Sequence, residues 1–440
     1  MYRTFFRKRK SFGIFLLVIL LCISFLLSAC SSDNGSENAA IIPNQKELEL
    51  FVASDLHLYS NNLIGANNTE YVKEEFSTDG RVQECDYEIV ETLVNETNVH
   101  KPDFLILTGD LSYNGEKDSH LELAKLLHKI KETQVLVIPG NHDLYSQNAF
   151  SVAEDKIKYI HSTNEQDFKD IYADFGYTNA YTYDENSLSY IYELAPDQWA
   201  LMLDTSQSEY NEEYGENLAG GYLEVPTLHW IEENLKYAKE HDISVVSFSH
   251  HNLLVHNAIF QSNYTLYNYE QLLTLFSKYD VNLNLSGHLH IQSIKSEDTD
   301  QNTVYDISSG SLLDFGNRYG VLNIYDNCFA YESRPLVFAD PLSHIPEYAF
   351  RVFADEYYSK TLPKYRSVLG DETSEAAVQL LSEINAYYFD GSYEQIHALT
   401  ESHKDLIRKI RRNTENYKTS YVRSIIEVPN ENQHQLLIER

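Results

Sequence analysis

The sequence predicts an α/β protein whose C-terminal part is helical. Short apolar, strand-like runs alternate with amphipathic, helix-like runs between residues 47 and 340, and this order is typical of a mostly parallel sheet covered by helices. Polar signatures rich in His, Asp and Gly follow several of the predicted strands. From about residue 341 onward the segments are long and have helical spacing.

Composition narrows the class of protein. With 440 residues, 43% of them hydrophobic and 23% charged, the chain is an ordinary globular mixture, which excludes wholesale disorder, collagen and a coiled coil. Asp and Glu outnumber Lys and Arg by 66 to 34, and a surface with a formal charge of −32 repels polynucleotides. The four cysteines have no CxxC spacing, so any bound metal must use His, Asp and Asn.

Residues 1–29 are predicted to be a lipoprotein signal peptide. Basic residues cluster in the first ten positions, and the uncharged apolar run 12–27 that follows is shorter than the ~20 residues of a membrane span. The run closes with Leu-Ser-Ala-Cys30, which resembles a bacterial lipobox. The resemblance implies lipidation of Cys30 and an anchor on the extracytoplasmic face of the bacterial cell membrane. The alternative is an uncleaved signal anchor in which Cys30 is a bystander.

The remaining chain divides into three parts. Residues 30–46 are mainly Ser, Asn, Asp, Gly and Glu, which predicts a flexible tether with a reach of roughly 20 to 25 Å. Residues 47–340 are expected to form the catalytic domain. Residues 341–440 are expected to form a C-terminal helical domain that packs beside the site or supports dimerisation, and the oligomeric state stays open.

The individual strands and helices are predicted from hydrophobic periodicity and from the positions of glycine and proline. Strands are expected at residues 47–54, 103–108, 135–138, 188–193, 199–203, 243–248, 281–285, 304–307, 319–325 and 329–331. Helices are expected in the catalytic part at residues 82–99, 117–131 and 226–241, the last with a proline in its first turn. C-terminal helices are expected at residues 348–360, 374–388, 393–413 and 417–426.

Five signatures fall at the C-terminal ends of predicted strands, where α/β sheets bind their ligands. They are Asp55-Leu56-His57, Gly109-Asp110, Gly140-Asn141-His142-Asp143, His250-His251 and Gly287-His288-Leu289-His290. A further DxH, Asp118-Ser119-His120, lies within a helical stretch and is interpreted as chance. The glycines of the five signatures suit tight turns in which the backbone passes close to another group.

The spacing within two signatures indicates shared pockets. In an extended segment the side chains of residues i and i+2 project to the same side. We therefore expect the side chains of Asp55 and His57 to point into one site, and those of His288 and His290 likewise to point into one site. Imidazole, carboxylate and amide ligands without thiolate suit Mn, Fe or Zn, whereas Ca and Mg prefer fewer histidines. A carboxylate that bridges two cations holds them ~3.5 to 4 Å apart for in-line displacement at phosphorus, and Asp110 is the candidate bridge.

These blocks, in this order, resemble the calcineurin-like metallophosphoesterase superfamily over residues 47–340. GNHD and residues 199–235 are most similar to class III cyclic-nucleotide phosphodiesterases. The resemblance implies a four-layer αββα sandwich. It implies first-metal ligands Asp55, His57, Asp110 and His290, and second-metal ligands Asp110, Asn141, His250 and His288. It also implies that His142 is the catalytic histidine and that Asp143 orients it.

Two positions depart from the family pattern. Many relatives have HHP in the fourth block, whereas Asn252 follows His251 here; both histidines stay candidates for the ligand, with His250 preferred and His251 lining the substrate pocket beside Asn141 and His142. Tyr113 in GDLSY matches a block of purple acid phosphatases, whose tyrosine binds ferric iron. Those enzymes lack the histidine of the first block. Because His57 is present here to fill that coordination position, Tyr113 is expected either to support the metal ligands from outside or to be structural, and the protein is expected to be colourless.

The predicted function is hydrolysis of a small phosphate ester at two metal ions (Mn, Fe or Zn). A phosphodiester such as a cyclic nucleotide is the first choice, because the similarity lies with that branch. A phosphomonoesterase or nucleotidase is the alternative enzyme. From a different class, a metal-capturing surface lipoprotein would explain the signal and the histidines, but it would not explain Asn141 or His142. Polynucleotide binding is not expected.

Overall fold

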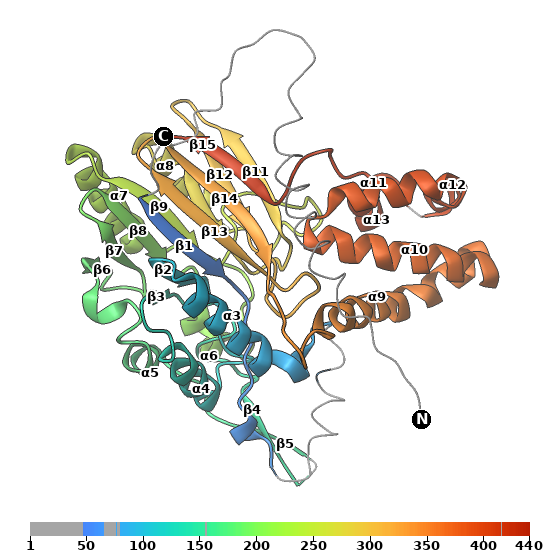
Figure 1. Cartoon of the computed structure of the whole chain (residues 1–440), viewed down its shortest axis with the longest axis horizontal. Coiled ribbons are helices and arrows are strands. Elements are labelled where there is room, and N and C mark those ends of the chain that lie inside the picture. The colour runs from blue at the N-terminus through green and yellow to red at the C-terminus, as the bar shows by residue number, and fades with distance from the viewer. Residues whose placement is uncertain (1–46, 66–75, 77–79, 155, 415) are drawn as a thin grey trace, which may run out of the picture. The chain divides into compact units, whose positions relative to one another are not determined.

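The structure, a computed structural model, describes residues 47–440 except 66–75, 77–79, 155 and 415 (Figure 1). The predicted signal peptide, the tether and Cys30 lie outside the described residues. Among the helices that the structure describes, none combines the length and apolarity needed to cross a membrane. The two described cysteines, Cys85 and Cys328, are not joined by a disulfide.

The first sheet has six strands in the order β15-β14-β13-β1-β2-β3. Its strands are β1 (Leu48–Ala53), β2 (Phe104–Leu107), β3 (Gln134–Val137), β13 (Arg318–Tyr325), β14 (Cys328–Pro335) and β15 (Gln435–Glu439). β1, β2 and β3 run parallel, whereas β13, β14 and β15 add antiparallel pairs. The parallel half carries the first three signatures at its C-terminal edge.

The second sheet has seven strands in the order β11-β12-β10-β9-β8-β7-β6. They are β6 (Thr182–Tyr183), β7 (Tyr190–Ala195), β8 (Gln198–Leu203), β9 (Ser244–Ser249), β10 (Leu283–Ser286), β11 (Ser293–Asp298) and β12 (Thr303–Ser308). The central strands β8, β9, β10 and β12 are parallel and the outer pairs are antiparallel. The expectation of a mostly parallel sheet is therefore wrong at the edges, because short turns such as that between β7 and β8 can join only antiparallel strands.

Alternating side chains of the strands fill the space between the two sheets. Leu50, Val52 and Ile106 of the first sheet pack in one cluster with Val246 and Phe248 of the second. Because each strand is buried on both faces, its sequence is an almost continuous apolar run, as in the FLIL of β2.

Helices cover both outer faces of the paired sheets. Phe51 and Leu105 face α3 (Asp86–His100) and α4 (Lys117–Leu127), while Leu201 and Leu203 face α7 (Val225–Glu240) and α8 (Tyr269–Lys278). The layers are thus helix, sheet, sheet and helix, which confirms the predicted αββα fold.

Smaller elements add to this sandwich and to the C-terminal helices. They are β4 (Phe150–Ala153), β5 (Lys156–Tyr159), α5 (Glu165–Ile171), α6 (Asn211–Tyr214) and the 3-10 helices η1 (Asn61–Leu63), η2 (Gln83–Cys85), η3 (Tyr177–Asn179), η4 (Ser208–Tyr210) and η5 (Tyr417–Thr419). The sequence did not predict them, except that η2 and η5 fall at the starts of the helices expected at 82–99 and 417–426. β4 and β5 form a separate two-stranded sheet.

The C-terminal helices are α9 (Ile345–Leu369), α10 (Asp371–Asp390), α11 (Tyr393–Ser402), α12 (Lys404–Asn413) and α13 (Tyr421–Ile426). The single helix expected at 393–413 is two helices that meet at His403. The all-helical expectation for 341–440 is wrong at its end, because β15 returns to the first sheet beside β14 (Figure 1). In QLLIE, Leu436 and Ile438 alternate with outward residues and pack into the core between the sheets.

Candidate metal centre

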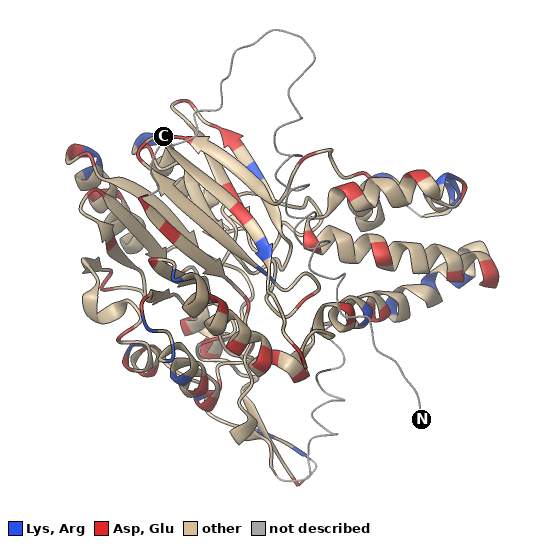
Figure 2. Cartoon of the chain, in the orientation of Figure 1, with Lys and Arg blue, Asp and Glu red and all other residues tan. Residues whose placement is uncertain are grey.

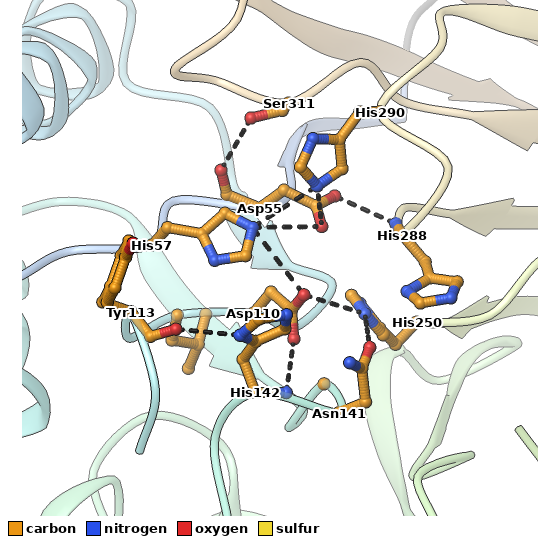
Figure 3. Close-up of polar contacts among 12 residues, drawn as sticks. Asp55, His57, Asp110, Tyr113, Asn141, His142, His250, His288, His290 and Ser311 are labelled. Carbon is orange, nitrogen blue, oxygen red and sulfur yellow. Dashed lines mark hydrogen bonds and ion pairs between the residues drawn. The ribbon is translucent and has the colours of Figure 1, made fainter. Parts of the chain in front are cut away.

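Five loops at the C-terminal ends of strands bring the predicted residues together (Figure 3). The loops that follow β1, β2 and β3 belong to the first sheet, and those that follow β9 and β10 belong to the second. Their edges adjoin because the sheets are stacked. The polar side chains that meet there are Asp55, His57, Asp110, Asn141, His142, His250, His288 and His290.

Two groups of ligands form within this cluster: Asp55 with His57 and His290, and Asp110 with His250 and His288. The ligand atoms of each group lie within 4.8 Å of one another. In the first group, His290 Nε2 lies 3.2 Å from Asp55 Oδ1 and 3.3 Å from His57 Nε2. The two groups of ligand atoms therefore correspond to the two predicted metal sites.

Asp110 lies between the two groups. Its Oδ2 is 3.7 Å from His57 Nε2 in the first group and 3.4 Å from His250 Nε2 in the second. Its Oδ1 accepts the backbone N–H of His142 at 2.9 Å, which leaves Oδ2 to serve both groups. Asp110 Oδ2 thus lies within 3.7 Å of a histidine nitrogen of each group, and its role as the bridging ligand stays a prediction.

Outer contacts fix the tautomers of two metal-facing histidines. His250 Nδ1 donates to the carbonyl of Thr108 at 2.9 Å, and His290 Nδ1 donates to the Asp314 carboxylate at 2.9 Å. Because these oxygens only accept hydrogen bonds, the Nδ1 atoms carry the hydrogens. The Nε2 atom of each neutral ring then presents a lone pair to the centre of the site.

The other two histidines differ in their outer contacts. His288 donates from Nε2 to the carbonyl of Asn263 at 2.9 Å, so its Nδ1 is the nitrogen left for a cation. His57 Nδ1 is buried without a hydrogen-bond partner among the described residues, although Gln83 donates to the His57 carbonyl at 2.6 Å.

The donor atoms that meet in the centre fit cations. Asn141 Oδ1 lies 3.1 Å from His250 Nε2, which in turn lies 3.4 Å from Asp110 Oδ2. When His250 is neutral with its hydrogen on Nδ1, all three atoms carry lone pairs and none carries a hydrogen, so they cannot hydrogen-bond to one another. Asp55 Oδ1 is a buried oxygen without a hydrogen-bond partner among the described residues. Converging imidazole, carboxylate and amide lone pairs are a typical ligand set for Mn, Fe or Zn.

Electrostatics favour positive charge at the same place. Burial lowers the pKa of His250, but the Asp110 carboxylate outweighs it and raises this pKa to about 9. Burial likewise lowers the pKa of His290, and Asp55 raises it to about 10. Burial and the neighbouring His250 lower the pKa of His288 to about 3. The carboxylates therefore stabilise positive charge on the two histidine rings that they contact, and the same negative charge would attract a cation.

The family model of the calcineurin-like phosphoesterases matches residues 48–292. The chain belongs to the calcineurin-like phosphoesterase family. No curated protein matches this phosphoesterase closely enough to count as a relative.

Solved structures with a similar fold have low sequence identity. A dimetal phosphatase of Danio rerio has 13% identity and a TM-score of 0.46, over 67% of this chain and 98% of that one. The protein TT1561 of Thermus thermophilus has 11% identity and a TM-score of 0.36, over 66% and 99%. GAP50, the anchor in the inner membrane complex of Plasmodium, has 12% identity and a TM-score of 0.36, over 70% and 95%. These likenesses do not bear on the reaction of the present phosphoesterase.

The backbone of the phosphoesterase turns sharply at its ligands, which corrects the reasoning from extended segments. Left-handed φ angles of 55°, 40°, 50°, 64° and 61° occur at Asp55, His57, Asp110, His288 and His290. Such conformations cost on the order of 1–3 kcal/mol each and concentrate at functional sites. The DxH pair serves one group, whereas the HxH pair is divided between both.

Glycine is required where β2 ends. Gly109 has a φ of 97°, and a Cβ added to it would lie 2.7 Å from His250 Nδ1. A larger residue would push this ring away from its group, so the sequence correctly indicated a close approach.

His142 lies at the centre as predicted, but another residue orients it. Its Nδ1 donates to the Tyr113 carbonyl at 2.8 Å and lies 3.1 Å from Asn114 Oδ1. Its ring centroid lies 5.0 Å from that of His57. Because Nδ1 of His142 is hydrogen-bonded within the protein, Nε2 is the ring nitrogen available to contact a substrate.

The expectation that Asp143 orients His142 is wrong. The Asp143 carboxylate is buried and accepts the backbone N–H groups of Leu111, Ser112 and Gly140 at 3.1, 2.8 and 2.8 Å. Adjacent residues of a tight turn point to different sides, so Asp143 joins the turn after β2 to the turn after β3. It supports the loops and does not contact the His142 ring in any described hydrogen bond.

The choice between the two adjacent histidines is resolved by their contacts. His250 belongs to the second group, whereas His251 is fully buried, with Nδ1 2.8 Å from the Thr205 hydroxyl and Nε2 3.1 Å from the Ala219 carbonyl. Both ring nitrogens of His251 are used within the protein. The expectation that His251 binds substrate is therefore contradicted.

Tyr113 contributes its ring to an aromatic cluster. The ring centroid lies 5.8 Å from that of Tyr59, 5.0 Å from that of Phe76 and 5.9 Å from that of Phe150. This environment agrees with the structural role expected for Tyr113.

Sequence reasoning missed the outer residues of the site. Asp314 follows β12 in a loop without a recognisable motif, and only its 2.9 Å contact with His290 reveals it. Thr108 and Asn263 act through their backbone carbonyls, which leave no side-chain signal in the sequence. The glycines and polar signatures could locate the centre but not these supports.

Proposed function

We propose that this phosphoesterase is a two-metal hydrolase of small phosphate esters, with phosphodiesters such as cyclic nucleotides as its preferred substrates. The observation that carries the proposal is the position of Asp110 Oδ2, within 3.7 Å of His57 Nε2 and 3.4 Å of His250 Nε2. Two cations held there by the two groups would supply Lewis-acid activation of the ester and of water. Mn, Fe and Zn are the candidates.

The chain's own groups have distinct tasks in this reaction. Asp110 and the histidines hold positive charge in a fixed arrangement, and Asn141 adds a neutral oxygen to the second group. His142 is fixed by the Tyr113 carbonyl at Nδ1, so an imidazolium form holds its second proton at Nε2. Donation of that proton to the departing alkoxide is a role worth ~10² to 10⁴ in rate.

The preference for small diesters rests on similarity and charge. GNHD and residues 199–235 follow the cyclic-nucleotide branch of the family. Acidic residues recur along the outer helices with fewer basic residues between them (Figure 2), in a chain of formal charge −32. Such a surface opposes polynucleotides, whereas a small anion can reach local cations.

The substrate class is tested with bis-p-nitrophenyl phosphate, p-nitrophenyl phosphate and 2′,3′- and 3′,5′-cyclic nucleotides, each assayed with Mn, Zn, Fe or a chelator. Preferential cleavage of diesters, abolished by the chelator, is expected. Preference for the monoester would favour a phosphomonoesterase or nucleotidase. Tight retention of metal without hydrolysis of any ester would overturn the proposal in favour of metal capture.

We propose further that the enzyme works outside the cytoplasm on a lipid anchor. Support comes from the basic N-terminal residues, the apolar run and the lipobox-like sequence ending at Cys30. In a bacterial host, Cys30→Ser is expected to abolish labelling by a fatty-acid probe and membrane recovery of the mature protein. Unchanged labelling and recovery would contradict the anchor.

A further inference from the structure

The loop formed by residues 257–264, between β9 and α8, is attached at one end to the C-terminal helices. Asn257 Nδ2 donates to the Tyr388 hydroxyl of α10 at 2.6 Å and lies 3.2 Å from Ser424 Oγ of α13. The Phe260 ring lies 5.0 Å from the Tyr421 ring of α13. Asn257 is buried, so these contacts are shielded from water.

The other end of the 257–264 loop contacts a predicted metal ligand. Asn263, with a φ of 70°, turns its carbonyl to His288 Nε2 at 2.9 Å. The Tyr264 ring lies 5.2 Å from the His288 ring and 5.5 Å from the Phe260 ring. A continuous chain of contacts therefore runs from the C-terminal helices to His288.

The ligand segment itself is attached to the same helices. Leu289 and Ile291 are buried in the apolar cluster that also contains Ile384 of α10. Immediately after the segment, the backbone N–H of Gln292 donates to the carbonyl of Phe389 at 2.8 Å. The two histidines of this segment face the metal groups (Figure 3). Leu289 and Ile291, which alternate with them, pack on the C-terminal helices.

We infer that the C-terminal helices position His288 for the second metal group through the 257–264 loop, with Asn257 as the positioning residue that anchors the loop. The Asn263 carbonyl selects the tautomer of His288 with hydrogen on Nε2, so that Nδ1 presents its lone pair to a cation. Loss of the anchor frees the loop and weakens that selection. The inference depends on the proposed metal centre.

Equilibrium dialysis against manganese, with metal measured by mass spectrometry, tests this role. Loss of outer support typically lowers metal affinity by ~10- to 100-fold. Because Asn257 acts through the loop, Asn257→Ala and Tyr388→Phe are each expected to weaken one of two manganese equivalents by about 10-fold, at the low end of that range. Tyr388→Phe keeps the ring and serves as the test if Asn257→Ala fails to fold. The matched control is Tyr365→Phe, which removes the 3.4 Å contact between the Tyr365 hydroxyl of α9 and Thr414 Oγ1, two residues that make no described contact with the 257–264 loop.

Two further measurements assign the effect to His288. Adding Asn257→Ala to His288→Ala is expected to weaken manganese binding no further, because the ligand that the anchor supports is already absent. In the metal-free protein, nitrogen NMR is expected to show the Nε2–H tautomer of His288, and a mixture of tautomers in Asn257→Ala.

The outcomes separate the inference from the proposed function. If the wild-type protein binds two manganese ions and both variants bind them equally well, the inference is overturned while the metal centre stands. Equal weakening by Tyr365→Phe also overturns it, since general loosening of the helices would then explain the effect. A wild-type protein that binds no manganese overturns both.

Discussion

The two metal groups differ in which acceptors hydrogen-bond to the outer ring nitrogens of their histidines. In the first group His290 is supported by the carboxylate of Asp314, whereas in the second group His250 and His288 are supported by the backbone carbonyls of Thr108 and Asn263. A carboxylate contributes a full negative charge and raises the basicity of the imidazole more than a carbonyl dipole does. The first group is therefore expected to bind its cation more tightly, and the second to depend more on how its loops are held.

Asp110→Ala should have the largest effect, because Asp110 Oδ2 lies 3.7 Å from His57 Nε2 of the first group and 3.4 Å from His250 Nε2 of its own group. Loss of the carboxylate removes a ligand from each group, so both cations and all hydrolytic activity are expected to be lost. Metal content by mass spectrometry and turnover of bis-p-nitrophenyl phosphate measure this. Asp118→Ala, on the exposed face of α4, is the control and should retain both metals. Retention of two cations by Asp110→Ala would contradict the bridging role of Asp110.

His142→Ala should separate chemistry from metal binding. The side chain belongs to neither group, and its backbone N–H, which holds Asp110 Oδ1, remains in the variant. We expect both cations to be retained at wild-type stoichiometry, while kcat falls by ~10² to 10⁴. Steady-state kinetics on metal-loaded protein provides the test, and unchanged kcat would refute the assigned role.

Asp314→Asn sharpens the comparison between the groups. The substitution keeps the shape of a buried side chain but removes the charge that supports His290. One manganese equivalent should lose ~10- to 100-fold in affinity, and that equivalent should be the one that Asn257→Ala leaves intact. Equilibrium dialysis of Asp314→Asn, Asn257→Ala and the double variant against manganese shows which equivalent each substitution weakens. Equal loss from both sites would mean that the groups do not have independent supports.

The sequence predicted those parts of the fold that depend on local periodicity. The FLIL of β2 and the LFVA at the end of β1 are recognisable because strand segments buried on both faces need apolar residues throughout. β15 was missed because most of its residues are exposed or half-buried and its place depends on pairing with β14. Short edge strands are defined by their partners more than by their own sequence.

Prediction of the site succeeded for side chains at strand ends and failed for their supports. Asp55 and His250 follow strands and have the chemistry of metal ligands, so pattern and residue type together located them. Asp143 was given the wrong partner because adjacency in GNHD does not mean contact across a turn. The Asn263 carbonyl belongs to a loop that contacts residues far along the chain, such as Tyr388 of α10, and such contacts leave no local signal in the sequence.

Tyr113→Phe should have the smallest effect, although sequence similarity to ferric phosphatases would predict a large one. The contact from Tyr113 to His142 is made by its backbone carbonyl, which phenylalanine retains, and its ring packs against Phe76 and Tyr59. We expect both metals to bind as in the wild type, with a change in the free energy of unfolding of about 1 kcal/mol or less from loss of the hydroxyl. Iron-loaded wild-type protein should show no intense visible band. An intense band in the wild type that Tyr113→Phe abolishes would make the phenolate a metal ligand, and the first group would then be incomplete without it.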